Sequence, residues 1–166
     1  MRIDRRTFVL AGVAVSTAAC ADSTAPPEPS ATVMVERQTL AVAMVPAGSV
    51  TWIQFTVPVR IHNTGSGPLR FVICASRLEA QGGDQWNAVW APVCLAESAM
   101  APEIPAGESR AFAVSVWASV QGSGSPAWRA TGTDGTYRFV AGVVRSGVGG
   151  VIPTVASNGF TLASGS

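Results

Sequence analysis

The stretch WIQFTVPVRIHNTGSGPLRFVIC, Trp52–Cys74, decides the fold because its residue order dictates a conformation over a longer run than any other. Apolar residues alternate with polar residues or proline from Ile53 to His62, which is the period of a half-buried strand. Residues 63–68, NTGSGP, break this alternation with residues that favour turns. A second strand begins at Leu69, so the stretch predicts two antiparallel strands that lie on a core supplied by the rest of the chain.

Pro58 is the irregular residue of the first strand, because proline cannot donate a hydrogen bond to a neighbouring strand. We expect either that its amide side faces a sheet edge or that a bulge lies there. The segment 76–84 is predicted to be a hairpin connection, and 95–103 is the one place where a short helical turn is plausible. The other predicted strands cover residues 32–45, with a break near Arg37, and 85–93, 109–120, 136–144 and 158–163.

The composition favours many short strands joined by turns. The chain has 166 residues with 17 Gly and 11 Pro, and Val, Thr, Phe and Trp are frequent. Strands at this spacing predict an all-β fold, a two-layer antiparallel β-sandwich of about seven strands with Greek-key connections. One domain of roughly 130 residues remains once the N-terminal leader is set aside, which is enough for an adequate core.

The charge balance differs between the leader and the body. The chain has 11 Arg, no Lys and 10 acidic residues, and the leader carries Arg2, Arg5 and Arg6 against Asp4. The body is therefore slightly acidic and has no electrostatic reason to bind nucleic acid or anionic lipid.

Residues 1–19 have the layout of a secretory signal peptide: a charged start that ends at Arg6, an apolar run over Phe8–Val15, and small residues before Cys20. The apolar run is too short to span a bilayer permanently. A buried core helix is the alternative interpretation, but it would have to hide the arginine pair.

Two resemblances refine this interpretation. The segment around Arg5 and Arg6, DRRTFVL, resembles the twin-arginine export motif but departs from it at Asp4 and Val9-Leu10. The segment TAAC, which ends at Cys20, resembles a bacterial lipobox and implies a diacylglycerol on Cys20, with the membrane as a partner. Because Ala21 follows Cys20, the resemblance to sorted lipoproteins favours the outer membrane over the inner one.

The chain then divides into a tether and a folded domain. Residues 20–31 contain three prolines and small polar residues, so this segment is predicted to be a flexible linker that reaches on the order of 30 Å. Residues 32–166 form the predicted β-sandwich domain, and no internal repeat is found in them.

The cysteine count fits an exported chain. With Cys20 at the cleavage point, Cys74 and Cys94 remain inside the domain, and two such cysteines are expected to form a disulfide. We expect the bond to join the strand that follows residues 63–68 to the segment after the Trp86 strand. Buried free thiols are the second alternative, and a metal site is improbable because there is no CxxC spacing.

Five segments together resemble the bacterial immunoglobulin-like domains of secreted proteins and lipoproteins. In order, they are RIHNTG at 60–65, a strand with Trp86, IPAGE at 104–108, GTYRF at 135–139 and SNGFTL at 157–162. The similarity covers about Val50–Ala163. It implies that Tyr137, the only tyrosine, occupies a tyrosine corner at the start of the penultimate strand, and a buried phenol bonded to nearby backbone is also its ordinary interpretation.

The chain carries no recognisable catalytic motif. His62 is the only histidine, lies on the polar face of a strand, and is not accompanied by a Gly-x-Ser-x-Gly elbow. Glu97, Glu103 and Glu108 surround one loop and are expected to be solvated, with weak calcium contact as a remote alternative. No glycine-rich loop precedes a helix, so we expect no enzyme activity, no cofactor and no metal.

The tryptophans are the most informative unassigned residues. Trp52 and Trp117 lie on the strand faces opposite the predicted core, so both are candidates for exposed aromatic contacts with protein or sugar. The alternative is that they pack at the ends and edges of the sandwich, as tryptophans of sandwiches commonly do.

These observations predict a lipid-anchored, non-catalytic immunoglobulin-like module of the cell envelope that serves protein interaction or structural spacing. Its partner is an unknown envelope protein or a glycan, and not nucleic acid. One alternative is a protease inhibitor that presents loop 121–125 or 145–157. Another is a carbohydrate-binding module that uses Trp52 and Trp117.

Overall fold

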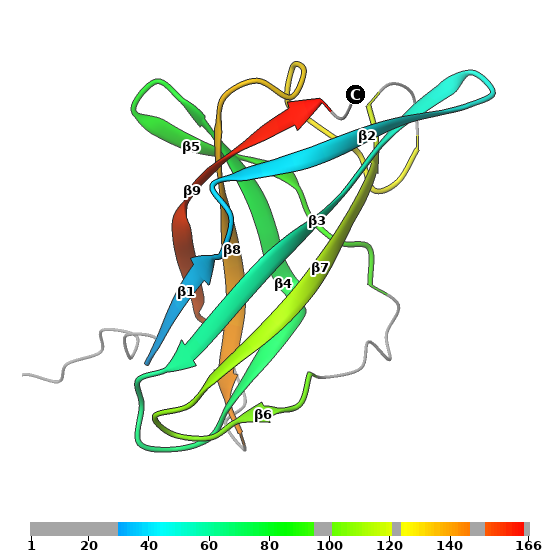
Figure 1. Cartoon of the computed structure of the whole chain (residues 1–166). Helices are drawn as coiled ribbons and strands as arrows, with labels where there is room; N and C mark the ends of the chain where they lie inside the picture. Colours follow the sequence, from blue (N-terminus) through cyan, green and yellow to red (C-terminus); the bar gives the residue numbers. More distant parts are fainter. Residues whose placement is uncertain (1–29, 95–100, 121–123, 147–151, 165–166) are drawn as a thin grey trace, which may run out of the picture.

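The described part of the chain is all-β and contains nine strands (Figure 1). The structure is a computed structural model that describes residues 30–94, 101–120, 124–146 and 152–164. The predictions for the signal peptide, Arg5, Arg6, Cys20 and most of the linker lie outside the described residues. The strands are β1 (Ala31–Val35), β2 (Thr39–Ala47), β3 (Val50–Asn63), β4 (Leu69–Gly82), β5 (Gln85–Trp90), β6 (Glu103–Ile104), β7 (Ser109–Ser119), β8 (Thr136–Arg145) and β9 (Thr154–Ser164).

The strands form two layers around one core, as predicted for a β-sandwich. One layer has the order β1-β3-β7, and the other has the order β5-β4-β8-β9. The short β6 pairs with β4, so β7 has no strand partner on its outer edge among the described residues.

β2 connects the two layers and explains why the sandwich is not purely antiparallel. Its first half, Thr39–Val42, runs parallel to β9, whereas Ala43–Ala47 pairs antiparallel with β3. The chain leaves the first layer after Val35 and joins the second, where it runs in the same direction as the last strand. The predicted break near Arg37 is therefore the crossing point between the layers.

The core confirms the alternation predicted for β3. Ile53, Val57, Val59 and Ile61 are fully buried, and Phe55 is nearly so. Each such side chain stabilises the fold by about 1.5–3 kcal/mol relative to an exposed one. The facing layer contributes Leu78, Phe139 and Phe160, and β7 contributes Val114, Val116 and Ala118.

Pro58 lies in the middle of β3 without a bulge, and its amide side faces a locally unpaired edge of the strand, which is one of the two expected arrangements. β2 pairs with β3 up to Gln54, and β1 resumes at Val59, so Pro58 faces the gap between them. Its carbonyl accepts from the amide of Glu36, 3.0 Å away, on the same side. The nitrogen of Pro58 therefore points into this gap, where no neighbouring strand requires a donor.

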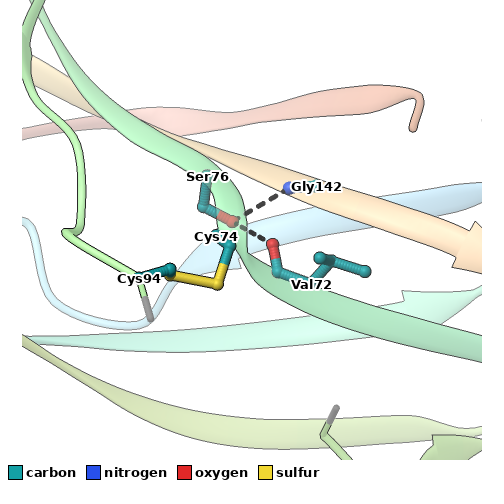
Figure 2. Close-up of a disulfide and its surroundings, with 5 residues drawn as sticks. All are labelled: Val72, Cys74, Ser76, Cys94 and Gly142. Carbon is teal, nitrogen blue, oxygen red and sulfur yellow. Dashed lines mark hydrogen bonds between the residues drawn. A yellow bond between two sulfur atoms is a disulfide. The ribbon is translucent and has the colours of Figure 1, made fainter. Parts of the chain in front are cut away.

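β4 is longer than predicted and contains a large bulge: the hairpin connection predicted over 76–84 is present but confined to the turn at Gly83 and Asp84, and residues 76–82 belong to β4. Val72 pairs with Gly142 and Arg77 pairs with Val140, so four residues of β4 face one residue of β8. The buried hydroxyl of Ser76 donates to the Val72 carbonyl and accepts from the Gly142 amide, both at 3.0 Å (Figure 2). A Cβ on Gly142 would lie 2.5 Å from that of Ala75, so the bulge requires glycine there.

The predicted disulfide between Cys74 and Cys94 is present and lies on this bulge (Figure 2). The two Cα atoms are 5.8 Å apart, and both residues are exposed. The bond joins β4 to the segment after β5, as expected. Closing a loop of 20 residues in the unfolded chain contributes roughly 3 kcal/mol to stability in the chain-entropy picture.

The ends of three other elements differ from the prediction. A second bulge leaves Val89 between the pairs Leu78–Trp90 and Glu79–Ala88, so Trp90 turns to the core rather than to the side of Trp86. β9 begins at Thr154, four residues earlier than predicted. Of the segment predicted to hold a helical turn, 95–100 lies outside the described residues and Glu103 belongs to β6.

Tyr137 has the geometry of a tyrosine corner. It is the second residue of β8, is 1% exposed, and donates its hydroxyl to the carbonyl of Asp134, 3.2 Å away. Burial raises the pKa of the phenol, and the negative charge of Asp134 raises it further. The phenol therefore closes the loop before β8 from inside the sandwich.

Asn63 is a fully buried polar residue at the end of β3. Its amide nitrogen donates to the carbonyls of Gly67 and Ile104 at 2.8 and 2.9 Å, and its side-chain oxygen accepts from the amide of Gly65 at 2.9 Å. One side chain therefore holds both the turn before β4 and the short strand β6.

We predict that Asn63→Ala lowers the free energy of unfolding by about 2–4 kcal/mol, because it leaves buried backbone groups without partners. Denaturant unfolding measures the change. Ser66→Ala is the control, since Ser66 is exposed in the same turn and should change stability by less than about 0.5 kcal/mol. Equal effects of the two substitutions would contradict the assigned role of Asn63.

Candidate binding surface

Trp52 and Trp117 meet on the outer face of the β1-β3-β7 layer. Their rings are stacked with centroids 3.9 Å apart and an angle of 8° between the planes. Trp117 pairs with Gln54 across the β3–β7 ladder, and Trp52 pairs with Ser119, so the indoles are diagonal neighbours on one face. The predicted outward direction of both side chains is therefore correct, and the two lie together.

The two indoles differ in exposure. Trp117 is 49% exposed, whereas Trp52 is half-buried because a second segment packs against it. A Cβ on Gly124 would lie 3.2 Å from Cη2 of Trp52 and 2.6 Å from Cβ of Ser119. Glycine thus lets the chain after β7 pass close to Trp52, and Trp52 in turn supports the more exposed ring.

Val45 extends this surface onto β2. It pairs directly with Trp52, so it points to the same face, and it is 41% exposed. Gln54 is exposed between the two strands. We call Val45, Trp52, Gln54 and Trp117 the Trp patch; its β2 and β3 members belong to the paired part of the β2–β3 hairpin, which extends from the body of the sandwich in Figure 1.

The other three tryptophans have structural environments. Trp128 is 4% exposed and packs against Phe55 and Tyr137. Trp90 is equally buried and donates its indole N–H to the carbonyl of Trp117, 3.4 Å away. Trp86 is half-buried under the guanidinium of Arg138, 4.4 Å from its ring centre.

Glu79 organises the outer face of the second layer, and the sequence analysis missed it. It is 5% exposed and forms ion pairs with Arg77 and Arg138, both at 2.6 Å. Burial raises the pKa of Glu79, but hydrogen bonds from Arg138 and Arg77 outweigh burial and hold the pKa below its usual value. In the sequence, the only indication of this cluster is that basic and acidic residues occur on strands that prove to be neighbours, Arg77 and Glu79 on β4 and Arg138 on β8.

An apolar groove of about 420 Å³ lies between the layers beside the outer edge of β7. Phe71 and Ile73 of β4, Trp90 of β5, and Phe112 and Val114 of β7 line it. Pro92 and Ala101 lie at its rim, next to residues 95–100, which the structure does not describe. The groove carries no titratable group among its lining residues, and its contacts are mainly apolar, with Ser115 as a polar lining residue.

His62 is the one candidate for catalysis, and its surroundings do not activate a nucleophile. Its Nδ1 lies 3.0 Å from the hydroxyl of Ser109 and 3.2 Å from the carbonyl of Glu108. A carbonyl can only accept, so these contacts favour a proton on Nδ1. The lone pair then lies on Nε2, and the histidine has no free base directed at Ser109.

The remaining predicted residues and loops can be placed only in part. Glu103 pairs with Arg70 and accepts from Ser146, and Glu97 lies outside the described residues. No three His, Cys, Asp or Glu among the described residues gather as metal ligands. Residues 121–123 and 147–151 of the two proposed inhibitory loops also lie outside the described part.

Comparison with known proteins leaves the chain without an assigned family. No family pattern and no curated protein matches it. A solved structure, the X-ray structure of Northeast Structural Genomics Consortium target SoR45, is similar over 81% of this chain and 87% of its own, with 13% identity and a TM-score of 0.46. In the described segments, no helix is long and apolar enough to cross a membrane.

Proposed function

We propose that this protein is a lipid-anchored, non-catalytic module of the cell envelope that acts through protein contacts made by the Trp patch. The observation that carries the proposal is the ordered stack of Trp52 on the half-exposed Trp117. Tryptophan is enriched among the residues that dominate binding energy at protein interfaces. Because the stack already holds the ring of Trp117, a partner loses little conformational entropy in burying it.

The anchor is supported by the leader sequence. Residues 1–19 have the pattern of a signal peptide, Cys20 follows small residues as in a lipobox, and the linker predicted over 20–31 leads into β1, which begins at Ala31. Ala31 pairs with Asn63 at one end of β3, whereas Trp52 lies eleven residues away along the same strand, or about 36 Å. A tether that enters at Ala31 therefore presents the patch near the opposite end of the domain.

A glycan is a less favoured partner than a protein, for a geometric reason. Carbohydrate sites need polar groups beside the aromatic ring, and the patch offers mainly Val45 and the amide of Gln54. Because the two indoles are stacked on each other, one face of each ring is already covered. The loops proposed for protease inhibition supply no comparable contact geometry in their described parts.

The first test concerns the anchor. Mass spectrometry of the protein from membranes of its own cell should find an N-terminal Cys20 that carries a diacylglycerol. Cys20→Ala should release the protein from the membrane fraction or block its processing. A mature N-terminus at Ala21, or an intact Met1, contradicts the lipoprotein part of the proposal.

The second test concerns the contacts. A photo-crosslinking amino acid, p-benzoylphenylalanine, replaces Trp117 in the cell-envelope protein, and ultraviolet light should join it to another polypeptide in a discrete band. The matched control replaces Met34, which is 50% exposed on β1 of the same layer. Crosslinking at neither position, or equally at both, contradicts a protein-contact role for the patch.

A further inference from the structure

We propose that the Trp patch binds a second copy of this chain, so that the protein self-associates side by side through the outer face of β2, β3 and β7. This inference rests on the proposed function, because it names the partner of the same surface. The residues involved are Val45, Trp52, Gln54 and Trp117.

The absence of charge at the patch supports a copy of the chain as the occupant. The segments that carry the patch, residues 39–59 and 111–120, contain no Asp, Glu, Arg, Lys or His. In a two-fold contact, residues of one copy lie close to the same residues of the other. A charged patch would repel its own copy, whereas this one meets no such penalty.

The patch also has a clear boundary on the same face. Toward the other end of β3, Arg60 pairs with Met34 across the β1–β3 ladder and forms an ion pair with Glu36. Met34 is about as exposed as Trp117, but charged side chains surround it. It therefore provides an exposed apolar residue outside the uncharged surface.

The polar atoms of the patch suit a symmetric contact. Neither indole N–H of Trp52 and Trp117 has a hydrogen-bond partner among the described residues, and the amide of Gln54 offers both a donor and an acceptor. In a two-fold contact, the side-chain oxygen of the facing Gln54 is available as an acceptor for an indole N–H. Stacking of the exposed faces of Trp117 adds apolar burial at the centre.

The anchor gives this contact a geometric advantage. Copies on one membrane would carry the same tether, which leads into β1 at Ala31, so they would share one surface layer. A standard stable interface buries about 800 Å² per partner, and a patch of this size is expected to bind more weakly. Attachment to one surface compensates by raising the effective concentration of the copies.

Analytical ultracentrifugation tests the inference on residues 20–166 carrying Cys20→Ser, a chain that contains every strand described here. We expect a monomer–dimer equilibrium between about 1 µM and 1 mM. Trp117→Arg and Val45→Arg should each raise the dissociation constant of the dimer about tenfold or more, because each places a charge against its own copy. Both positions are exposed, and unfolding midpoints confirm that the variants fold.

Met34→Arg is the matched control and should leave the equilibrium unchanged. A dimer that resists both patch substitutions, or that Met34→Arg disrupts equally, overturns the inference. A monomer at every concentration overturns it too, whether the patch then binds lipid vesicles or another protein. If the protein is monomeric and position 117 crosslinks to a different polypeptide, the proposed function stands and only the self-association fails. If position 117 crosslinks to nothing, both the proposed function and the self-association fail.

Discussion

The structure depends on burial of one face of β3. Because side chains of a strand alternate, the requirement that Ile53, Phe55 and Val57 lie between the layers also decides what lies outside. β7 pairs with β3 without a register shift from Trp52 to His62, so its own alternation is fixed by the same core. A slip of one residue would bury Trp117 and expose Val116, and the core therefore holds the exposed stack in place.

A second constraint is the crossing of the first strand between the layers. β1 and the end of β2 pair with the same side of β3 and leave a gap at Pro58. This crossing brings β2 beside β9 and leaves its second half as a hairpin with β3, so Val45 reaches the face of Trp52. The core, the crossing and the Trp patch are consequences of one arrangement of strands.

Local alternation predicted the fold and the outward direction of Trp52 and Trp117, because it depends only on neighbouring residues. It could not predict features that depend on pairing between distant strands. The bulge in β4 needs both Ser76 and Gly142, which are far apart in sequence, and the inward turn of Trp90 follows from the irregular pairing of β4 and β5. The Arg77–Glu79–Arg138 cluster and the stack itself were missed for the same reason, since each joins separate strands.

Hydroxyl-radical footprinting of the protein tests the self-association of the Trp patch most directly, because one experiment reads Trp117 and Met34 together. The two side chains are about equally exposed in the single chain, at 49% and 50%. The account predicts that oxidation of Trp117 slows as protein concentration rises, while oxidation of Met34 keeps its rate. A rate of Trp117 oxidation that does not change with concentration would contradict it.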